Sequence, residues 1–349
     1  MKLIDYIIVD TINRCKGQKS LVGYWSILQG KRTVQTIQDT HLFGLTNYFG
    51  LFSFLTQEEF TTYIDTLQKE QILLTDLQLS EKAKKLHVES CEKFNQFEWN
   101  GWNYHRIDQT FWRRLILFIQ TITSVSKKQN FVPIVSDWEI QKEVKQIVLT
   151  LKKRSDVTLE QLHKELATFL QTMTKEQAEL FVHQLSGSQL IGLTISQAAE
   201  LILVDRDEAY LLHKATLHEL LQQLYEQPNA YPVLSLLHLN QQKKQKLSHS
   251  TEITKQYYYQ GFSVEEISKK RDLKLATIQD HIVELALLET EFDLYSLFDE
   301  PSIQIVEEAI ESKKTKKLKE LKEVLPEYID YFMIRLVLAR RSKNHEFES

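Results

Sequence analysis

The chain has 349 residues, 42% hydrophobic and 26% charged, which is long enough for two or three folded domains and is not typical of a disordered protein. Nine glycines and five prolines argue against an all-β or doubly wound fold, and we expect a mainly α-helical, multi-domain protein. A net charge of −4 excludes a uniformly basic surface, so any contact with nucleic-acid phosphates must come from local clusters of Lys and Arg.

Residues 1–90 are predicted to form a winged-helix-like domain. Apolar residues at helical spacing occupy residues 2–13, and a second helix begins after Ser20 and ends at Gly30. Thr33 and Thr56 have the spacing of N-caps for two further helices. Residues 72–79 then alternate apolar and polar side chains, which is typical of a short wing.

A small basic group precedes one of these helices. Lys31 and Arg32 stand directly before the N-cap Thr33, and Gln35 and Gln38 follow in the helix. Basic side chains at a helix start suit phosphate oxygens. An ordinary polar helix start explains the same residues, so both interpretations stay open.

Residues 91–128 are predicted to form an aromatic helical connector. Its aromatic residues are Phe94, Phe97, Trp99, Trp102, Tyr104, Phe111, Trp112 and Phe118. Aromatic rings beside arginines can stack on single-stranded bases. At helical spacing such rings more often fill a core or a seam between domains, and we favour packing.

Residues 129–247 are predicted to form a helical middle domain. Residues 192–221 have the outline of a helix-turn-helix whose second helix starts near Arg206 or Asp207. Exposed acidic side chains are expected on that second helix: Asp207, Glu208 and Glu219. Because these would repel phosphates, we assign the unit to packing or protein contact. Residues 241–246 are predicted to form a polar, basic linker.

Residues 248–349 are predicted to form a helix-turn-helix domain. Three helices follow from the apolar spacing of residues 250–287, with Gly261 ending the first and Ser263 and Glu266 forming a capping box for the second. The third is expected to expose Thr277, Gln279, Asp280, Val283 and Glu284. In DNA-binding proteins of this class, that exposed face enters the major groove.

The predicted DNA contacts combine the helix-turn-helix with the strongest basic cluster of the chain, residues 313–322. The side chains expected to contact DNA are Lys269, Lys270, Arg271, Lys274, Thr277, Gln279, Lys313, Lys314, Lys316, Lys317, Lys31 and Arg32. Residues 249–349 carry 15 Lys and Arg against 20 Asp and Glu, so the binding should be weak and made mostly through phosphates. Gln279 alone suits a bidentate contact with adenine, because Asp280 and Glu284 would be repelled by phosphates.

Three segments carry a family resemblance. "GFSVEEISKKRDLKLATIQDHIVEL" and "LKELKEVLPEYIDYFMIRLVLA", residues 318–339, resemble the helicase-associated helix-turn-helix domain of some bacterial RecQ helicases and of free-standing YpbB-type proteins. "LQGKRTVQTIQDTHLFGLTNYFG", residues 28–50, resembles the front end of a YpbB-type protein. The resemblance implies a separately encoded helper that partners a RecQ-type helicase in DNA repair or recombination.

Several classes of chemistry lack their sequence signatures. The chain has no GxxxxGK[ST] loop, HExxH, GxSxG or CxxC motif, and Cys15 and Cys91 stand in separate segments. We therefore expect no enzyme activity, cofactor or metal. We also expect no signal peptide, and no apolar run is long enough to span a membrane, which favours the cytoplasm, including the nucleoid. The alternative function is a helical scaffold or transcription regulator whose helix-turn-helix units mainly bind protein.

Overall fold

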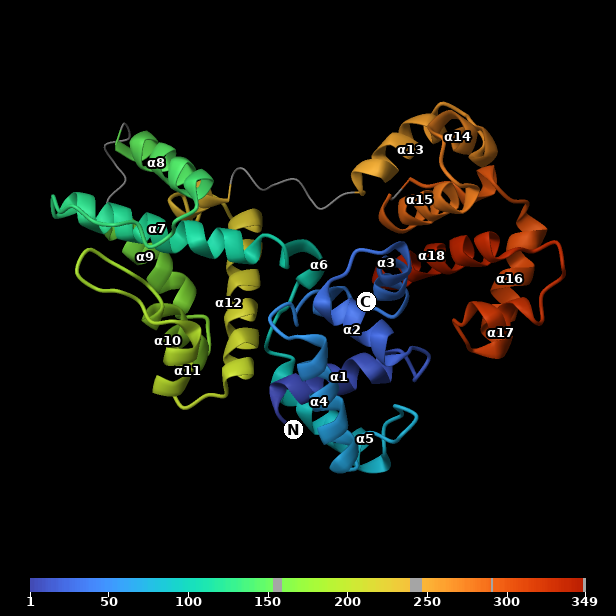
Figure 1. Cartoon of the computed structure of the whole chain (residues 1–349), viewed down its shortest axis with the longest axis horizontal. Coiled ribbons are helices and arrows are strands. Elements are labelled where there is room, and N and C mark those ends of the chain that lie inside the picture. Colours follow the sequence, from blue (N-terminus) through green and yellow to red (C-terminus); the bar gives the residue numbers. More distant parts are fainter. Residues whose placement is uncertain (153–158, 239–246, 290, 348–349) are drawn as a thin grey trace. The chain divides into compact units, whose positions relative to one another are not determined.

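The computed structural model describes residues 1–152, 159–238, 247–289 and 291–347 (Figure 1). The described residues are mainly helical, and the predicted mainly α-helical, multi-domain fold is confirmed. They form no strand, and their β-interaction is an isolated antiparallel bridge between Leu73 and Leu79. In place of the short β-hairpin predicted as a wing at residues 72–79, the described chain has this single bridge. The predicted basic linker, residues 241–246, lies outside the described residues.

Backbone contacts divide the chain into two compact units. The middle unit contains Met1–Val9 and Glu81–Lys244, and the terminal unit contains Asp10–Ser80 and Gln245–Ser349. Residues 10–80 therefore pack with the C-terminal region, although sequence patterns suggested a separate domain for residues 1–90. Local periodicity cannot report a contact between segments so far apart in the chain. The finer division at residues 90, 128 and 247 stays a prediction.

Helices make up the described part of the middle unit. They are α5 (Glu81–Phe94), α6 (Gly101–Tyr104), α7 (Asp108–Ser126), α8 (Trp138–Lys152), α9 (Leu159–Leu170), α10 (Lys175–His183), α11 (Ile195–Leu201), α12 (Arg206–Glu226) and the 3-10 turn η2 (Leu234–Leu237). Helix α12 packs against α6, α7, α10 and α11, and is buried along most of its length (Figure 1). It begins at Arg206, as predicted.

The burial of α12 changes the interpretation of its acidic residues. Asp207, Glu208 and Glu219 were expected to be exposed, but each is half-buried. Burial raises the pKa of Glu208 and of Glu219 above the ordinary range for Glu. These side chains are less exposed than predicted because α12 contacts four other helices, which leaves little of its surface open to solvent. The unit α11–α12 is thus a packed part of the core.

The aromatic segment supplies much of this core. Trp99 and Trp112 are 5% and 7% exposed, while Phe111 and Phe118 are fully buried. Trp112 contacts the rings of Phe181 and His213 edge-on, at centroid distances of 5.1 and 4.7 Å. Packing, and not base stacking, is therefore the role of most of these rings.

A buried ion network joins α7 to α12. Nζ of Lys214 lies 2.6 Å from the carboxylate of Asp108, and Nε2 of His218 lies 3.4 Å from the same oxygen. All three side chains are at least 97% buried, since their exposed fractions are 3%, 0% and 0%. Burial alone would raise the pKa of Asp108, but Lys214 and His218 together hold it well below its usual range.

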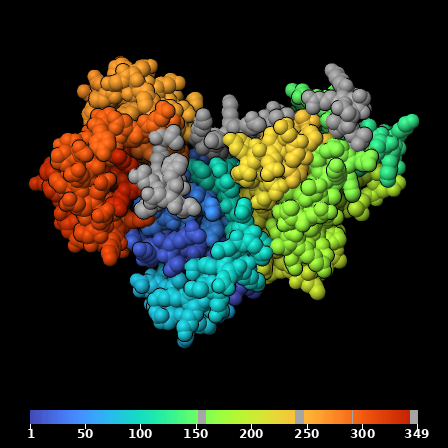
Figure 2. All heavy atoms as spheres, turned by 180° about the vertical axis from the view of Figure 1, so that it is seen from behind, coloured from blue at the N-terminus to red at the C-terminus, as the bar shows by residue number. Residues whose placement is uncertain are grey.

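The terminal unit combines helices from both ends of the chain. They are the last part of α1 (Leu3–Arg14), from Asp10 on, with α2 (Leu21–Gln29), α3 (Val34–Leu42), η1 (Thr46–Tyr48), α4 (Gln57–Lys69), α13 (His249–Tyr259), α14 (Val264–Arg271), α15 (Leu275–Leu288), η3 (Leu294–Ser296), α16 (Glu300–Lys313), α17 (Leu318–Lys322) and α18 (Tyr331–Phe347). In Figure 2 the atoms of α13 to α18, coloured orange to red, form one continuous mass.

Local signals set the N-terminal helices of this unit. Ser20, Thr33 and Thr56 are N-caps, as predicted, and Glu59 completes a capping box with Thr56. Gly30 ends α2 in the left-handed conformation with φ of 81°, which glycine adopts without strain. Helix α3 then packs against both α15 and α18, so the N-terminal segment directly supports the helix-turn-helix.

Candidate nucleic-acid interface

The helix-turn-helix is built from α13, α14 and α15, as the sequence predicts. The capping box is confirmed, because the N–H of Glu266 donates to Oγ of Ser263 at 3.2 Å and the N–H of Ser263 donates to the Glu266 carboxylate at 2.8 Å. Gly261 has φ of +87° just after α13. Asp272, with φ of 50°, makes the tight connection from α14 towards α15.

The predicted apolar line forms the small core of this domain. Val264 and Ile267 of α14 are buried, as are Ile278, Ile282 and Leu285 of α15. These residues repeat at three- and four-residue spacing, which places them on one face of each helix. The predicted pattern thus matches the packing of α14 and α15 at these positions, whereas Ile253, Tyr257 and Tyr258 of α13 are only half-buried.

The second half of α15 differs from the prediction. Val283 and Glu284 were expected on the exposed face, but both are buried, with exposed fractions of 0% and 2%. The Glu284 carboxylate accepts hydrogen bonds from the Ser248 N–H at 2.8 Å and the Thr251 hydroxyl at 2.6 Å. The physical reason is that α15 contacts α3 and α18 as well as α13 and α14, so only the start of α15 is open.

Asp280 does not stand alone on α15. Nη1 of Arg335 lies 2.7 Å from its carboxylate, and Nε of Arg335 donates to Oε1 of Gln38 at 3.1 Å. Gln38 is buried and therefore is not part of a surface phosphate site at the start of α3. The negative charge of Asp280 is balanced within the terminal unit.

Three lysines surround the open start of α15. Lys269 and Lys270 end α14, Lys274 is the N-cap of α15, and all three are exposed. Thr277 and Gln279, in the first turns of α15, are half-buried. Nζ of Lys270 lies 4.3 Å from the ring centroid of Phe262, which restrains the side chain without neutralising it. We call Lys269, Lys270 and Lys274 the turn lysines.

Arg271, unlike the turn lysines, is engaged in hydrogen bonds within the protein. Its guanidinium donates to the carbonyl of Ser250 at 2.8 Å, to the hydroxyl of Ser250 at 3.1 Å and to the hydroxyl of Thr254. These bonds tie the end of α14 to α13. The side chain is therefore occupied in holding the helix-turn-helix together, and our proposed interface leaves it out.

The basic cluster at residues 313–322 divides into exposed and engaged side chains. Lys313, Lys314 and Lys317 are exposed. Lys316 is half-buried and donates to the carbonyl of Leu42, and its burial lowers the pKa of its amine. Lys322 donates to three carbonyls that follow α17, at 2.6 to 3.2 Å. Its side chain thereby fixes the segment after α17 to the end of that helix.

The N-terminal basic pair lies before α3. Lys31 is exposed and Arg32 is half-buried, while Thr33 accepts a hydrogen bond from the Thr36 N–H at 3.2 Å. Sequence reasoning missed two basic residues that lie near α3, namely Lys19 and Arg335. Lys19 lies 2.5 Å from Asp39 of α3, and Arg335 bonds Gln38 of the same helix. Neither contact has a local sequence signal, because each partner comes from another helix or loop.

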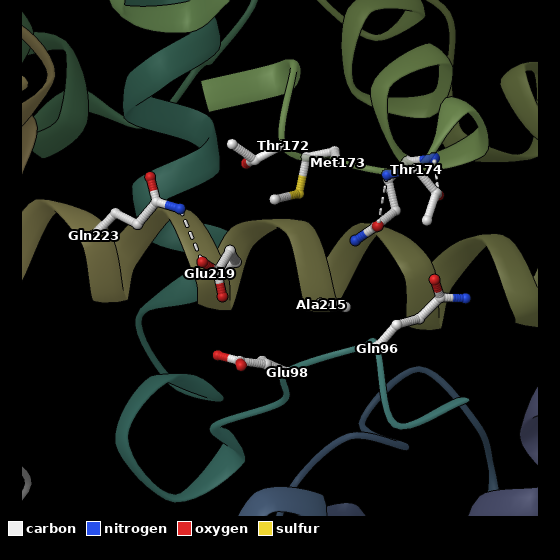
Figure 3. A pocket seen from close by; sticks show the side chains of 9 residues that line it. Gln96, Glu98, Thr172, Met173, Thr174, Ala215, Glu219 and Gln223 are labelled. Carbon is white, nitrogen blue, oxygen red and sulfur yellow. Dashed lines mark hydrogen bonds between the residues drawn. The ribbon is translucent and has the colours of Figure 1, made fainter. Parts of the chain in front are cut away.

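The middle unit has a pocket of about 230 Å³ with acidic walls. Figure 3 shows the carboxylates of Glu98 and Glu219 next to each other, with Gln223 donating to Glu219 at 2.8 Å. Burial raises the pKa of Glu219, and the nearby charge of Glu98 raises it further. Two carboxylates make this pocket unsuitable for phosphate.

Within the parts of the chain that the structure describes, no cluster of three or more His, Cys, Asp or Glu side chains could hold a metal ion. No described helix is long and apolar enough to cross a membrane.

Comparisons with known proteins identify the C-terminal domain. Residues 250–338 match a family described as a helix-turn-helix domain. The whole chain is similar to Protein YpbB of Bacillus subtilis (strain 168), with 27% identity over 356 residues that cover 99% of each protein. No solved structure matches the chain.

Proposed function

We propose that this protein is a non-enzymatic DNA-binding accessory protein that partners a RecQ-type DNA helicase in DNA repair or recombination. The observation that carries the DNA-binding part is the open start of α15, where exposed Lys269, Lys270 and Lys274 border the turn of a helix-turn-helix. Side chains at this place in a helix-turn-helix can reach phosphates. Base readout is restricted to the first turns of α15, so binding is largely independent of sequence.

The helicase partnership rests on resemblance. Two of the three segments that carry the resemblance, residues 28–50 and 318–339, contain α3 and the start of α18, which pack together in the terminal unit. They therefore belong to one structural module. Similarity to Protein YpbB over the whole chain supports the same family relation.

The middle unit supplies a surface suited to a protein partner. Val132 and Trp138 are 86% and 73% exposed at the connection from α7 to α8. The Gln120 side chain holds this connection, because it donates to the Val132 carbonyl at 3.1 Å and accepts from the Ile134 N–H at 2.9 Å. Exposed apolar side chains on a fixed backbone favour protein association. We place the helicase contact here.

Binding of the purified chain to the purified helicase of its own host tests the partnership, after nuclease treatment of both proteins. Trp138→Ala with Val132→Ser should weaken that binding by about tenfold or more, because buried aromatic anchors dominate interfaces. Leu203→Asn is the matched control, since Leu203 is 92% exposed elsewhere in the middle unit and Asn tolerates its positive φ. Folded proteins that do not bind without DNA would refute a direct partnership.

A second candidate is a helical scaffold or transcription regulator whose helix-turn-helix units mainly bind protein. The burial of Val283 and Glu284 favours it, because half of α15 is closed to a DNA groove. Salt-independent association with DNA, or no association, would favour this candidate over DNA binding through phosphates.

A further inference from the structure

A cavity of about 320 Å³ in the terminal unit is lined mainly by three separate segments, two of which supply basic residues. Lys19 precedes α2, Gln35 and Asp39 lie on α3, and Lys316, Lys317 and Lys319 surround the start of α17. We call this cavity the basic pocket. Sequence reasoning treated the start of α3 and residues 313–322 as two unrelated clusters, whereas the fold brings parts of both to one site.

The charges of the basic pocket do not balance. Four amines line it against one carboxylate, that of Asp39. Asp39 already accepts from Nζ of Lys19 at 2.5 Å and from the amide of Gln35 at 2.9 Å. Lys317 has Glu320 at 3.1 Å, but both side chains are nearly half exposed, so this pair neutralises little. An excess of positive charge remains for a bound anion.

Lys316 is half-buried, whereas Lys317 and Lys319 of the same pocket are exposed. It donates to the carbonyl of Leu42 and lies 5.1 Å from the ring centroid of Phe43, so its position is fixed. Its backbone N–H also donates to Oε1 of Gln18 at 3.0 Å. Because burial penalises a charged amine, an anion beside Lys316 gains more than it would beside a fully solvated lysine.

The walls and the size of the basic pocket define its ligand further. Leu42, Leu318 and Leu338 add an apolar side to the cavity. Its volume lies at the lower end of the range for small-molecule sites and suits one phosphorylated group with a small organic body. An internal phosphate of a duplex continues into the backbone on both sides and cannot enter such a cavity. A terminal phosphate can.

We propose that the basic pocket binds a phosphate monoester carried on a small organic body. The monoester is a dianion, and converging amines bind it through charge-assisted hydrogen bonds. Two sources share this chemistry: the 5′-phosphorylated end of a DNA strand and a free nucleotide. Binding of a 5′-phosphorylated DNA end rests on the proposed DNA-binding function, whereas binding of a free nucleotide does not.

The test compares the full chain with two blunt DNA duplexes of the same sequence, one ending in a 5′-phosphate and one in a 5′-hydroxyl, and with AMP and adenosine. We expect about tenfold tighter binding of the phosphorylated duplex, equivalent to one charge-assisted hydrogen bond. AMP should bind or abolish this preference, and adenosine should do neither. Lys317→Gln with Lys319→Gln should remove the preference, while Lys313→Gln, an exposed lysine that does not line the pocket, should keep it.

The outcomes separate this proposal from the DNA-binding function. Binding of AMP without binding of either duplex supports the pocket, assigns it to a free nucleotide and contradicts DNA binding. Equal binding of both duplexes together with no AMP binding refutes the pocket and leaves DNA binding intact. A preference that persists in the Lys317→Gln, Lys319→Gln variant would also refute the assignment to this pocket.

Discussion

The guanidinium of Arg335 lies 2.7 Å from the carboxylate of Asp280 and thereby joins α18 to the exposed side of α15. The same side chain reaches α3, because its Nε donates to Oε1 of Gln38 at 3.1 Å. Helices α3 and α18, which support the helix-turn-helix, thus meet its helix α15 at one arginine. Asp280, which would repel DNA phosphates by itself, has its charge balanced there.

Replacing this arginine should affect both stability and DNA binding. Arg335→Gln should lower the free energy of unfolding by about 1 to 3 kcal/mol, because it removes hydrogen bonds from the buried Gln38 and the half-buried Asp280. It should also weaken DNA binding, because the charge of Asp280 is no longer balanced. Urea unfolding and fluorescence anisotropy measure the two effects. Adding Asp280→Asn should restore affinity without restoring stability, and an affinity unchanged in Arg335→Gln would contradict the role of Asp280.

The buried network of the middle unit makes a second prediction. Asp108→Asn or Lys214→Met alone should lower the free energy of unfolding by about 3 to 5 kcal/mol, because each leaves an uncompensated buried charge. The double variant should be more stable than either single one. Chemical unfolding of the four proteins measures the coupling. Strictly additive losses would show that Asp108 and Lys214 do not act as a pair.

Acidification should destabilise the middle unit through its buried histidines. Burial lowers the pKa of His213 to about 4, whereas an unfolded histidine titrates near its ordinary value of about 6.5. Between these values the unfolded chain binds more protons than the folded one, so the free energy of unfolding decreases as pH falls. From pH 7 to pH 5 His213 should account for about 2 kcal/mol of that decrease.

Comparison with a variant isolates this histidine from other titrating groups. His213→Gln cannot take up the proton, so its stability should depend less steeply on pH than that of the original chain. Urea unfolding at pH 7, 6 and 5 measures both slopes. Parallel curves for the two proteins would mean that His213 does not carry the pH dependence.

Much of the helical fold was predictable because its signals are local. The capping box of Ser263 and Glu266 and the left-handed stop at Gly261 depend on neighbours within a few residues. The burial of Glu284 was not predictable, since its carboxylate binds Ser248 and Thr251 at the start of α13, and both are more than 30 residues away in sequence. A charged residue at an apparently exposed helical position gives no sign of such a partner.

The sequence predicted which segment forms the candidate interface, but not which of its basic side chains are exposed. Lys269, Lys270 and Lys274 keep the exposure that their positions around a turn suggest. Arg271, their neighbour, is engaged by Ser250 and Thr254 of α13. The difference depends on the direction of one side chain, which residue type and spacing do not determine. The basic pocket required contacts between α3 and residues 316–319, which only the fold supplies.

The salt dependence of duplex DNA binding tests the central claim most directly. Each phosphate contact contributes about 0.9 to the slope of log affinity against log salt concentration. We expect a slope of roughly −3 to −4.5 for the original chain. Lys269→Ala, Lys270→Ala and Lys274→Ala combined should reduce its magnitude by about 2 to 3, with no change in sequence preference. An unchanged slope and affinity in the folded triple variant would contradict DNA binding through the helix-turn-helix.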